Sequence, residues 1–383
     1  MALVKPDVAR FARIKVLGLG GGGCNAVNTM ISDSQIQGVD FIALNTDAQA
    51  LLACNAPVKL QLGENLTKGL GVGGNPDLGK QAAEESREKI AGLLVDTDMV
   101  FITGGFGGGT CTGSASIVAE IAREQGALTI GVVTKPFAFE GTRRMIISEE
   151  GLEALKSKVD ALIVIPNQKL LDTVDKKMTL IDAFKLVDGV LGKGVQGISD
   201  IITQPGLINR DFADVKAVMK DAGTAFMGIG TGVGENRAQS AARAAISSPL
   251  LEVSIDGAKG ILFTITGGSD LTMLEVEEAA VIISEKADAD ASIIFGATID
   301  EKLVDQIKVT VIAAGFDEAR AKMARFMSPS VSVITPSEKK EEEEPEKIIE
   351  EPQKFEEEES DSNIPPEELG KEFDVPAFLR QGR

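Results

Sequence analysis

Apolar residues along the chain follow two alternating patterns, short continuous runs and runs spaced by three or four positions. Continuous apolar runs predict strands of a parallel sheet, because such strands are covered on both faces. Helically spaced segments separate them, which is typical of a doubly wound α/β domain. We expect strands at 14–19, 41–45, 99–103, 128–134 and 160–165, and helices at 24–31 and 114–124.

One apolar stripe is much longer than the others. It runs from Leu180 to Ile202 in steps of three and four and predicts a single helix over 178–202. At 1.5 Å per residue this helix spans roughly 37 Å, enough to cross a domain. Four glycines make it a poor isolated helix, so it must be held by burial.

A second α/β unit follows the long helix, with less regular alternation and therefore a mixed sheet. The predicted fold class is α/β: a mostly parallel, doubly wound domain, a long central helix, and a second α/β domain with a mixed sheet. The second unit contributes strands at 224–230, 260–266, 291–297 and 307–314, and helices at 211–219, 235–247 and 271–285.

The two ends differ from this body in composition. Sixteen acidic residues and five lysines fall between 336 and 373, a balance that favours a disordered, self-repelling linker. Apolar residues return at the end of the chain and suggest a short peptide that binds a partner, through Asp374, Pro376, Phe378, Leu379 and Arg380. The expected divisions are a flexible start (1–12), a first domain (13–177), the helix (178–202), a second domain (203–316), the linker (317–373) and the peptide (374–383).

Composition excludes several kinds of function. The chain has no histidine, so it cannot build a Ser-His-Asp triad or a metal site with histidine ligands. A net charge of −19 argues against nucleic acid as the main partner. The three cysteines lack a CxxC spacing, and no apolar run is long enough to span a membrane. We expect a cytoplasmic protein with no direct membrane insertion.

The most informative stretch is Gly104–Gly113, in which six of ten residues are glycine. It connects a predicted strand to a predicted helix, and so presents backbone N–H groups and a positive helix end to an anion. A side chain would block that close approach. A flexible linker of the same composition would not be held between a strand and a helix, so phosphate binding is favoured.

Two further glycine segments accompany it. Gly18–Gly23 matches G-x-G-x-x-G, which alone also fits a dinucleotide-binding oxidoreductase. A second phosphate loop at 104–113 instead favours a longer polyphosphate, and no G-x-x-x-x-G-K-[ST] motif occurs. Gly69–Asn75 precedes a helix opened by Pro76, and either closes over a terminal phosphate or is a plain surface loop.

Several motifs occur together in a characteristic order. They are G-G-G-T-C-T-G at 107–113, G-G-G-G-C-N at 20–25, N-T-D at 45–47, K-P-F-A-F-E-G-T-R-R at 135–144, N-R-D-F-A-D at 209–214 and the terminal peptide. This set resembles bacterial FtsZ, a member of the tubulin/FtsZ family of GTPases. The resemblance covers about residues 13–316 and the terminal peptide.

The resemblance implies GTP or GDP as the ligand, with Mg²⁺ carried by the nucleotide. Glu140 and Arg144 would contact the ribose and phosphate side, Phe184 would stack on guanine, and Asp188 would accept from its N1–H and N2 groups. As a plain alternative, Phe184 belongs to the apolar stripe and is simply core. The implied nucleotide-binding residues are Gly20, Gly21, Gly22, Gly23, Cys24, Asn25, Asn45, Asp47, Gly73, Gly74, Gly107, Gly108, Gly109, Thr110, Cys111, Thr112, Glu140, Arg144, Phe184 and Asp188.

The implied catalytic residues lie at the other end of the long helix. Asn209, Asp211 and Asp214 would enter the nucleotide site of the next subunit and polarise the attacking water. No metal ligand would come directly from one subunit. The resemblance therefore implies a head-to-tail homopolymer that forms the division ring at midcell, with membrane-tethering and regulatory division proteins bound by the terminal peptide.

Two other interpretations stay open at this point. Cys111 occupies a position that is usually glycine in the family, which would allow a GTP-binding filament protein with little hydrolysis. The other is an NAD-dependent oxidoreductase. If Cys24 and Cys111 lie close together, oxidation would block the site.

Overall fold

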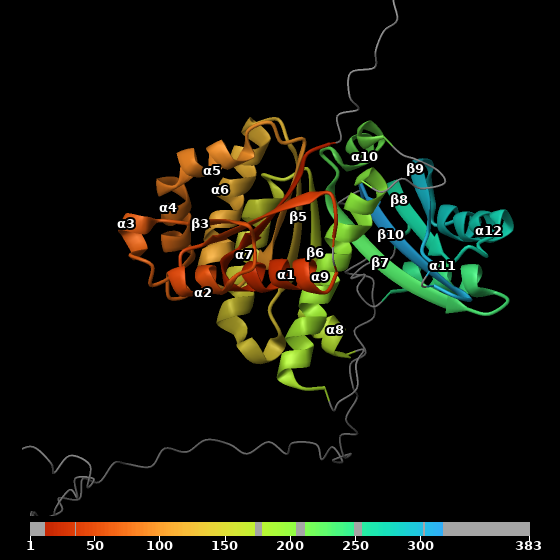
Figure 1. Ribbon diagram of the computed structural model, residues 1–383, viewed down its shortest axis with the longest axis horizontal. Helices are drawn as coiled ribbons and strands as arrows, with labels where there is room; N and C mark the ends of the chain where they lie inside the picture. The colour runs from red at the N-terminus through yellow and green to blue at the C-terminus, as the bar shows by residue number, and fades with distance from the viewer. Residues whose placement is uncertain are drawn as a thin grey trace, which may run out of the picture. The chain divides into compact units, whose positions relative to one another are not determined.

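Ten strands form one mixed sheet in the computed structural model, which describes residues 12–34, 36–172, 178–203, 211–248, 255–301 and 303–316. The strand order is β3-β2-β1-β4-β5-β6-β7-β10-β8-β9 (Figure 1). The strands are β1 (Ile14–Leu19), β2 (Val39–Asn45), β3 (Val58–Gln61), β4 (Met99–Gly105), β5 (Leu128–Lys135), β6 (Ala161–Pro166), β7 (Gly223–Val233), β8 (Ala258–Gly267), β9 (Ala287–Ile299) and β10 (Gln306–Ala314).

The strands from β3 to β7 are parallel, and β10 pairs antiparallel with both β7 and β8. The predicted parallel first sheet and mixed second sheet are therefore confirmed. The two sheets are also continuous, because β7 joins β6 over the short register from Ala161↔Gly223 to Ile163↔Ala225. Chain order reverses between β1 and β4, which is where doubly wound sheets bind ligands at the carboxyl ends of their strands.

Side chains alternate between the two faces of the parallel sheet. Ile14 and Val16 of β1 join a core beneath α1 and α9, whereas Leu17 and Leu19 join a core beneath α5 and α6. A third core lies between α11, α12 and the strands β8 and β10. The helices are α1 (Gly20–Ser32), α2 (Ala48–Ala53), α3 (Glu64–Thr67), α4 (Pro76–Glu85), α5 (Arg87–Leu94), α6 (Thr110–Glu124), α7 (Thr142–Lys156), α8 (Asn167–Asp172), α9 (Leu180–Thr203), α10 (Phe212–Met219), α11 (Arg237–Ile246) and α12 (Met273–Ser284), with a 3-10 turn, η1, at Ala138–Glu140.

The long helix α9 lies close to where it is expected, and its glycines explain how it packs. A methyl group on Gly194 would lie 2.9 Å from Val132 of β5, and one on Gly197 would lie 3.0 Å from Thr310 of β10. The missing side chains therefore let one helix approach strands from both halves of the sheet. Among the described residues, no helix is long and apolar enough to cross a membrane.

Two sequence-based boundaries differ from the structure in an informative way. Helices α1 and α6 begin at Gly20 and Thr110, four residues earlier than expected in each case. Gly20–Gly23 are thus already helical and Gly104 and Gly105 still belong to β4, whereas 107–109 form the loop that the sequence suggested. They tolerate this because the loop and helix lie too close together for side chains: a methyl group on Gly23 would lie 2.7 Å from the Thr103 carbonyl oxygen.

Candidate functional site

A cavity of about 330 Å³ opens at the carboxyl ends of β1, β4 and β5, at the point where the strand order reverses. Its lining includes eleven of the residues predicted to bind a nucleotide: Gly20, Gly21, Gly22, Asn25, Gly108, Thr110, Cys111, Glu140, Arg144, Phe184 and Asp188. Seven residues outside the predicted binding set complete it: Gly105, Phe106, Thr134, Pro136, Asn167, Val187 and Leu191.

Two helix N-termini meet at this cavity. Helix α1 starts at Gly20 and α6 at Thr110, and neither has an acidic residue in its first turn or a side-chain hydrogen bond at its N-cap. Their first N–H groups therefore remain available, with the positive end of each helix dipole behind them. The two loops also touch, since a methyl group on Gly22 would lie 3.2 Å from the Gly105 nitrogen. This arrangement suits several negatively charged oxygens side by side.

Threonine hydroxyls stiffen the second loop. The Thr112 hydroxyl accepts a hydrogen bond from the Gly107 N–H at 3.0 Å, which holds the loop. Neither of these two residues lines the cavity. The Thr110 hydroxyl lies at the cavity and hydrogen-bonds the Thr46 hydroxyl at 2.7 Å. Gly107 has φ = 94°, a conformation that favours glycine.

The third glycine segment lies beside this loop and not on the cavity wall. A methyl group on Gly109 would lie 2.5 Å from Val72 and 2.8 Å from the Asn75 nitrogen. Asn75 caps α4 by accepting from the Asp77 N–H. Gly73 and Gly74 have positive φ and no atoms within 4 Å of an added Cβ. Their predicted contact with a terminal phosphate stays a prediction.

Four other predicted residues support the site from behind. The Asn45 side chain is buried; its Oδ1 accepts from the Asp47 N–H at 3.3 Å, and its Nδ2 lies 3.9 Å from the Cys24 sulfur. Asp47 caps α2, and Gly23 packs against Gly18. None of the four, Gly23, Cys24, Asn45 and Asp47, lines the cavity, so the structure gives them a supporting position.

All three cysteines are buried and free, and two of them lie side by side. Cys24 lies beside Cys54, whose sulfur is 3.6 Å from the Cys24 carbonyl oxygen, whereas Cys111 belongs to the core on the opposite face of the sheet. Cys24 and Cys111 therefore belong to cores on opposite faces of the sheet, and oxidation that joins them stays untested. The Cys111 sulfur occupies the space that a side chain on Gly104 would need, at 2.6 Å from an added methyl group. Burial raises the pKa of the Cys111 thiol to about 12, so it stays neutral near pH 7.

The opposite wall of the cavity carries charge and an aromatic ring. Arg144 Nη1 donates to Glu140 Oε2 at 2.6 Å, across one turn of chain. Phe184 and Asp188 lie one turn apart on α9 and both face the cavity. The Phe184 side chain is 42% exposed, so it is not simply core. Burial raises the pKa of Asp188 to about 7.

Among the seven lining residues that sequence reasoning missed, Asn167 has the most distinctive environment. It is 5% exposed, lines the cavity, and its Oδ1 has no hydrogen-bond partner among the described residues. An unpaired buried acceptor is costly, so a water or a ligand bound in the cavity would be stabilised by donating to this oxygen. The available signal was its position: Asn167 directly follows β6, at the same sheet edge as the glycine loops.

The predicted catalytic acids lie far from this cavity. Between Phe184 and Thr203, α9 rises roughly 28 Å at 1.5 Å per residue. Asp211 then caps α10 through the Ala213 N–H, and Asp214 lies in the first turn. Asn209 and the whole terminal peptide fall outside the described residues.

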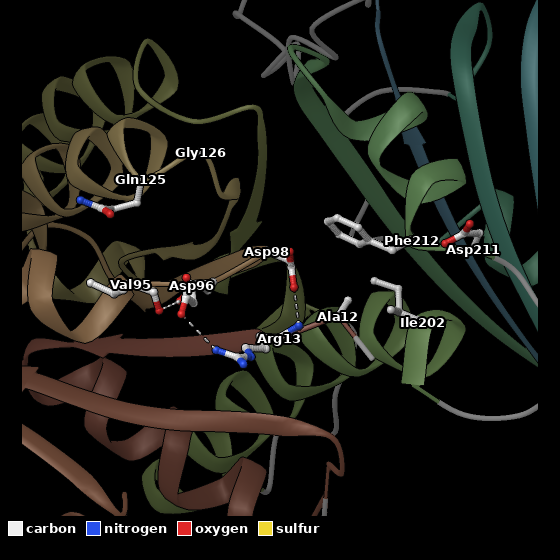
Figure 2. A pocket seen from close by; sticks show the side chains of 11 residues that line it. Ala12, Arg13, Val95, Asp96, Asp98, Gln125, Gly126, Ile202, Asp211 and Phe212 are labelled. Atoms are coloured by element: carbon white, nitrogen blue, oxygen red, sulfur yellow. Dashed lines mark hydrogen bonds and ion pairs between the residues drawn. The ribbon is translucent and has the colours of Figure 1, made fainter. Parts of the chain in front are cut away.

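Asp211 borders a second cavity of about 730 Å³ at the amino-terminal edge of β1 and β4 (Figure 2). On one side of this cavity, Arg13 forms an ion pair with Asp96 at 3.6 Å and donates its backbone N–H to Asp98 at 2.8 Å. Phe212 and Ile202 lie on the other side (Figure 2). Asp211 thus lies at the edge of the sheet opposite the first cavity, beside the second cavity, which Asp96 and Asp98 also line.

Comparison with known proteins assigns the chain to a family. The GTPase domain of the Tubulin/FtsZ family matches residues 13–175, and the C-terminal domain of the FtsZ family matches residues 223–317. An FtsZ dimer from M. jannaschii is 48% identical, with a TM-score of 0.77 over 81% of this chain and 90% of that one. The chain belongs to the FtsZ family. A point mutant of M. jannaschii FtsZ is similarly close, at 49% identity, a TM-score of 0.77, and 81% and 92% coverage.

More distant relatives share the fold. CetZ2 from Haloferax volcanii, solved as a GTPγS-bound protofilament, is 18% identical, with a TM-score of 0.69 over 82% of this chain and 98% of that one. At that identity the likeness concerns the fold alone. Membership of the FtsZ family makes this chain a member of a GTPase family that binds guanine nucleotides, and it removes the oxidoreductase interpretation.

Proposed function

We propose that this protein hydrolyses GTP at a site completed by a second copy of the same chain, and that it polymerises head to tail. One observation carries the proposal: the cavity has phosphate-type loops and a base-type wall, but its predicted catalytic acids lie at the far end of α9. A residue roughly 28 Å away along a rigid helix cannot reach the nucleotide of its own molecule. A neighbouring copy supplies it.

The nucleotide is held as follows. The N–H groups at the starts of α1 and α6 bind the phosphates, and the Glu140–Arg144 pair lies on the ribose and phosphate side. Guanine stacks on Phe184 and donates N1–H and its N2 amino group to Asp188, which adenine cannot match. The unpaired acceptor of Asn167 offers a further position for a guanine donor.

Hydrolysis rests on positioning and charge, which suits a chain without histidine. The Asp211 and Asp214 carboxylates of the next subunit orient and polarise the attacking water. Mg²⁺ arrives with the GTP phosphates and neutralises their charge. Asn209 belongs to the same proposed loop, and the third glycine segment, with Gly73 and Gly74, closes over the terminal phosphate.

A contact between two different faces of one molecule does not close on itself, so it generates filaments. We propose that these filaments form the cytoplasmic division ring, and that the terminal peptide around Phe378 binds membrane-tethering and regulatory division proteins. The acidic linker keeps that peptide extended from the filament.

A second candidate function rests on Cys111, which lines the cavity where glycine is usual. In that case the protein binds GTP and forms filaments but hydrolyses slowly. The thiol is neutral and its sulfur lies against Gly104, so this side chain adds no negative charge beside the phosphates.

The proposal is tested by light scattering of the purified full chain with Mg²⁺. Scattering should rise on addition of GTP, stay flat with GDP, and decay as GTP is consumed, with phosphate released in parallel. Absence of any GTP-dependent rise at high protein concentration would rule out the polymer. A rise that persists without phosphate release would favour the second candidate.

A further inference from the structure

Phe137 lies directly behind the base-side wall of the cavity. It is 1% exposed, follows β5 at the start of the turn η1, and does not itself line the cavity. Its ring meets the Phe184 ring edge to face, with centroids 5.5 Å apart and an interplanar angle of 89°. A fully buried ring thus supports a partly exposed one, and only the exposed one can touch a ligand.

The backbone of Phe137 is fixed from two sides. Its N–H donates to Glu140 Oε1 at 2.9 Å, while the other oxygen of the same carboxylate accepts from Arg144 at 2.6 Å. The next N–H, of Ala138, donates to Gln168 Oε1 at 3.2 Å. Gln168 neighbours Asn167, so the turn is tied to the element that carries the unpaired acceptor.

We propose that Phe137 is a positioning residue for nucleotide affinity, acting through Phe184. This inference rests on the proposed function, because it assumes that Phe184 stacks on the base. Edge-to-face contact holds the Phe184 ring in one orientation before the nucleotide arrives, which removes an ordering cost from binding. Phe137 also contacts Glu140 through its backbone N–H, so it connects Phe184 to the Glu140–Arg144 pair and holds them at a fixed distance from each other.

Phe139 provides a matched control. Its ring stacks on Phe137 with centroids 5.0 Å apart and an interplanar angle of 14°, and it is 60% exposed. Changing Phe139 to Leu removes an aromatic neighbour of Phe137 on the solvent side and leaves the edge contact with Phe184 in place. A change that only makes the turn more flexible would weaken GTP binding in both Phe137→Leu and Phe139→Leu. Loss of the edge contact with Phe184 would weaken it only in Phe137→Leu.

The test is a double-mutant cycle on GTP affinity with the full chain. Phe137→Leu should weaken GTP and GDP binding about three- to tenfold, raise KM by a similar factor, and leave kcat within about twofold. Phe184→Leu should weaken binding further. In the Phe184→Leu background, Phe137→Leu should have no additional effect, and Phe139→Leu should bind like the parent chain.

Three outcomes would overturn the proposal: unchanged affinity in Phe137→Leu, the same loss in both backgrounds, or an equal loss in Phe139→Leu. If Phe137→Leu does not fold, as judged by thermal unfolding without nucleotide, Phe137→Met fills the volume without a ring and gives the same cycle. Failure of the parent chain to bind GTP would instead overturn the proposed function, so the two failures are distinguishable.

Discussion

The carboxyl group of Asp188 lies one turn of α9 beyond the ring of Phe184, and both side chains face the same cavity. The two residues line the same cavity, but only Asp188 can ionise. Burial raises the pKa of Asp188 to about 7, whereas the ring has no charge to lose. The wall that we propose to bind the base is therefore expected to change its charge within the physiological pH range.

GTP affinity should fall as pH drops below 7, by roughly tenfold per pH unit, because only the carboxylate accepts the two guanine donors. The free energy of unfolding without nucleotide should instead increase as the pH falls. The folded pKa lies above the unfolded value near 4, so the stability that protonated Asp188 contributes is fully present below pH 4 and is lost as pH rises through 7.

Asp188→Asn should remove both pH dependences. Asp182→Asn is the control, on the same helix but exposed and bonded to Thr179. Calorimetric titrations with GTP and thermal unfolding at pH 6, 7 and 8 measure the two effects. Persistence of the affinity change in Asp188→Asn would assign it to another group.

Asn167 and Asn45 are both buried, but only Asn45 has its side-chain oxygen satisfied within the described protein. Asn167→Leu should therefore leave stability without nucleotide unchanged and weaken GTP binding about tenfold or more, through the lost hydrogen bond. Asn45→Leu should instead cost about 1–3 kcal/mol of unfolding free energy. Thermal unfolding and GTP titration of the two variants give the contrast, and destabilisation by Asn167→Leu would mean that its oxygen is already paired.

Cys111→Gly tests whether the cysteine limits hydrolysis. We expect phosphate release within about twofold of the parent chain, and a stability loss of about 1 kcal/mol from glycine in the first turn of α6. Cys111→Ala separates the side-chain volume from the glycine effect. A large increase in phosphate release in both variants would support the slowly hydrolysing filament protein.

Asp214→Asn and Asp211→Asn should bind GTP normally and lose at least about a hundredfold in turnover. Asparagine remains a good N-cap, so the cap that Asp211 makes to α10 is kept. Asp221→Asn removes the same charge from an exposed residue that pairs with Arg123 and should leave turnover unchanged. Normal turnover in Asp214→Asn would remove this residue from the mechanism.

Mixing variants tests which molecule supplies the acids. Asp214→Asn keeps an intact cavity, and Asp188→Asn keeps intact acids. In a shared site, the mixture contains contacts that join an intact cavity to intact acids, so it should hydrolyse GTP faster than the average of the two proteins alone. Turnover equal to that average would place the complete site within one molecule.

The sequence predicted the sheet and the positions of the glycine loops because both depend on local patterns. Continuous apolar runs define β1, β4 and β5, and glycine clusters mark the loops at their ends. Strand β3 was missed, because it has only four residues. The helices α2, α3, α5, α7 and α8 were missed as well; all but α7 have eight residues or fewer, and α7 buries few of its side chains. None of these elements gives a strong periodic signal.

Parts of the site depend on tertiary contacts that no local pattern contains. Asn167 is a single residue after a strand, and its importance comes from burial without a partner for its oxygen among the described residues. Phe137 belongs to a motif that drew attention to Glu140 and Arg144, and its role depends on a ring 47 positions further along the chain. The positions of Cys24 and Cys111 on opposite faces likewise follow from the sheet and not from the spacing.

If one molecule alone lacks a complete active site, GTP turnover per subunit must depend on protein concentration. We expect almost no turnover at low concentration, then a rise beyond a threshold that coincides with the onset of light scattering. A constant turnover per subunit over the whole range, from well below that threshold, would mean that each molecule carries a complete site of its own.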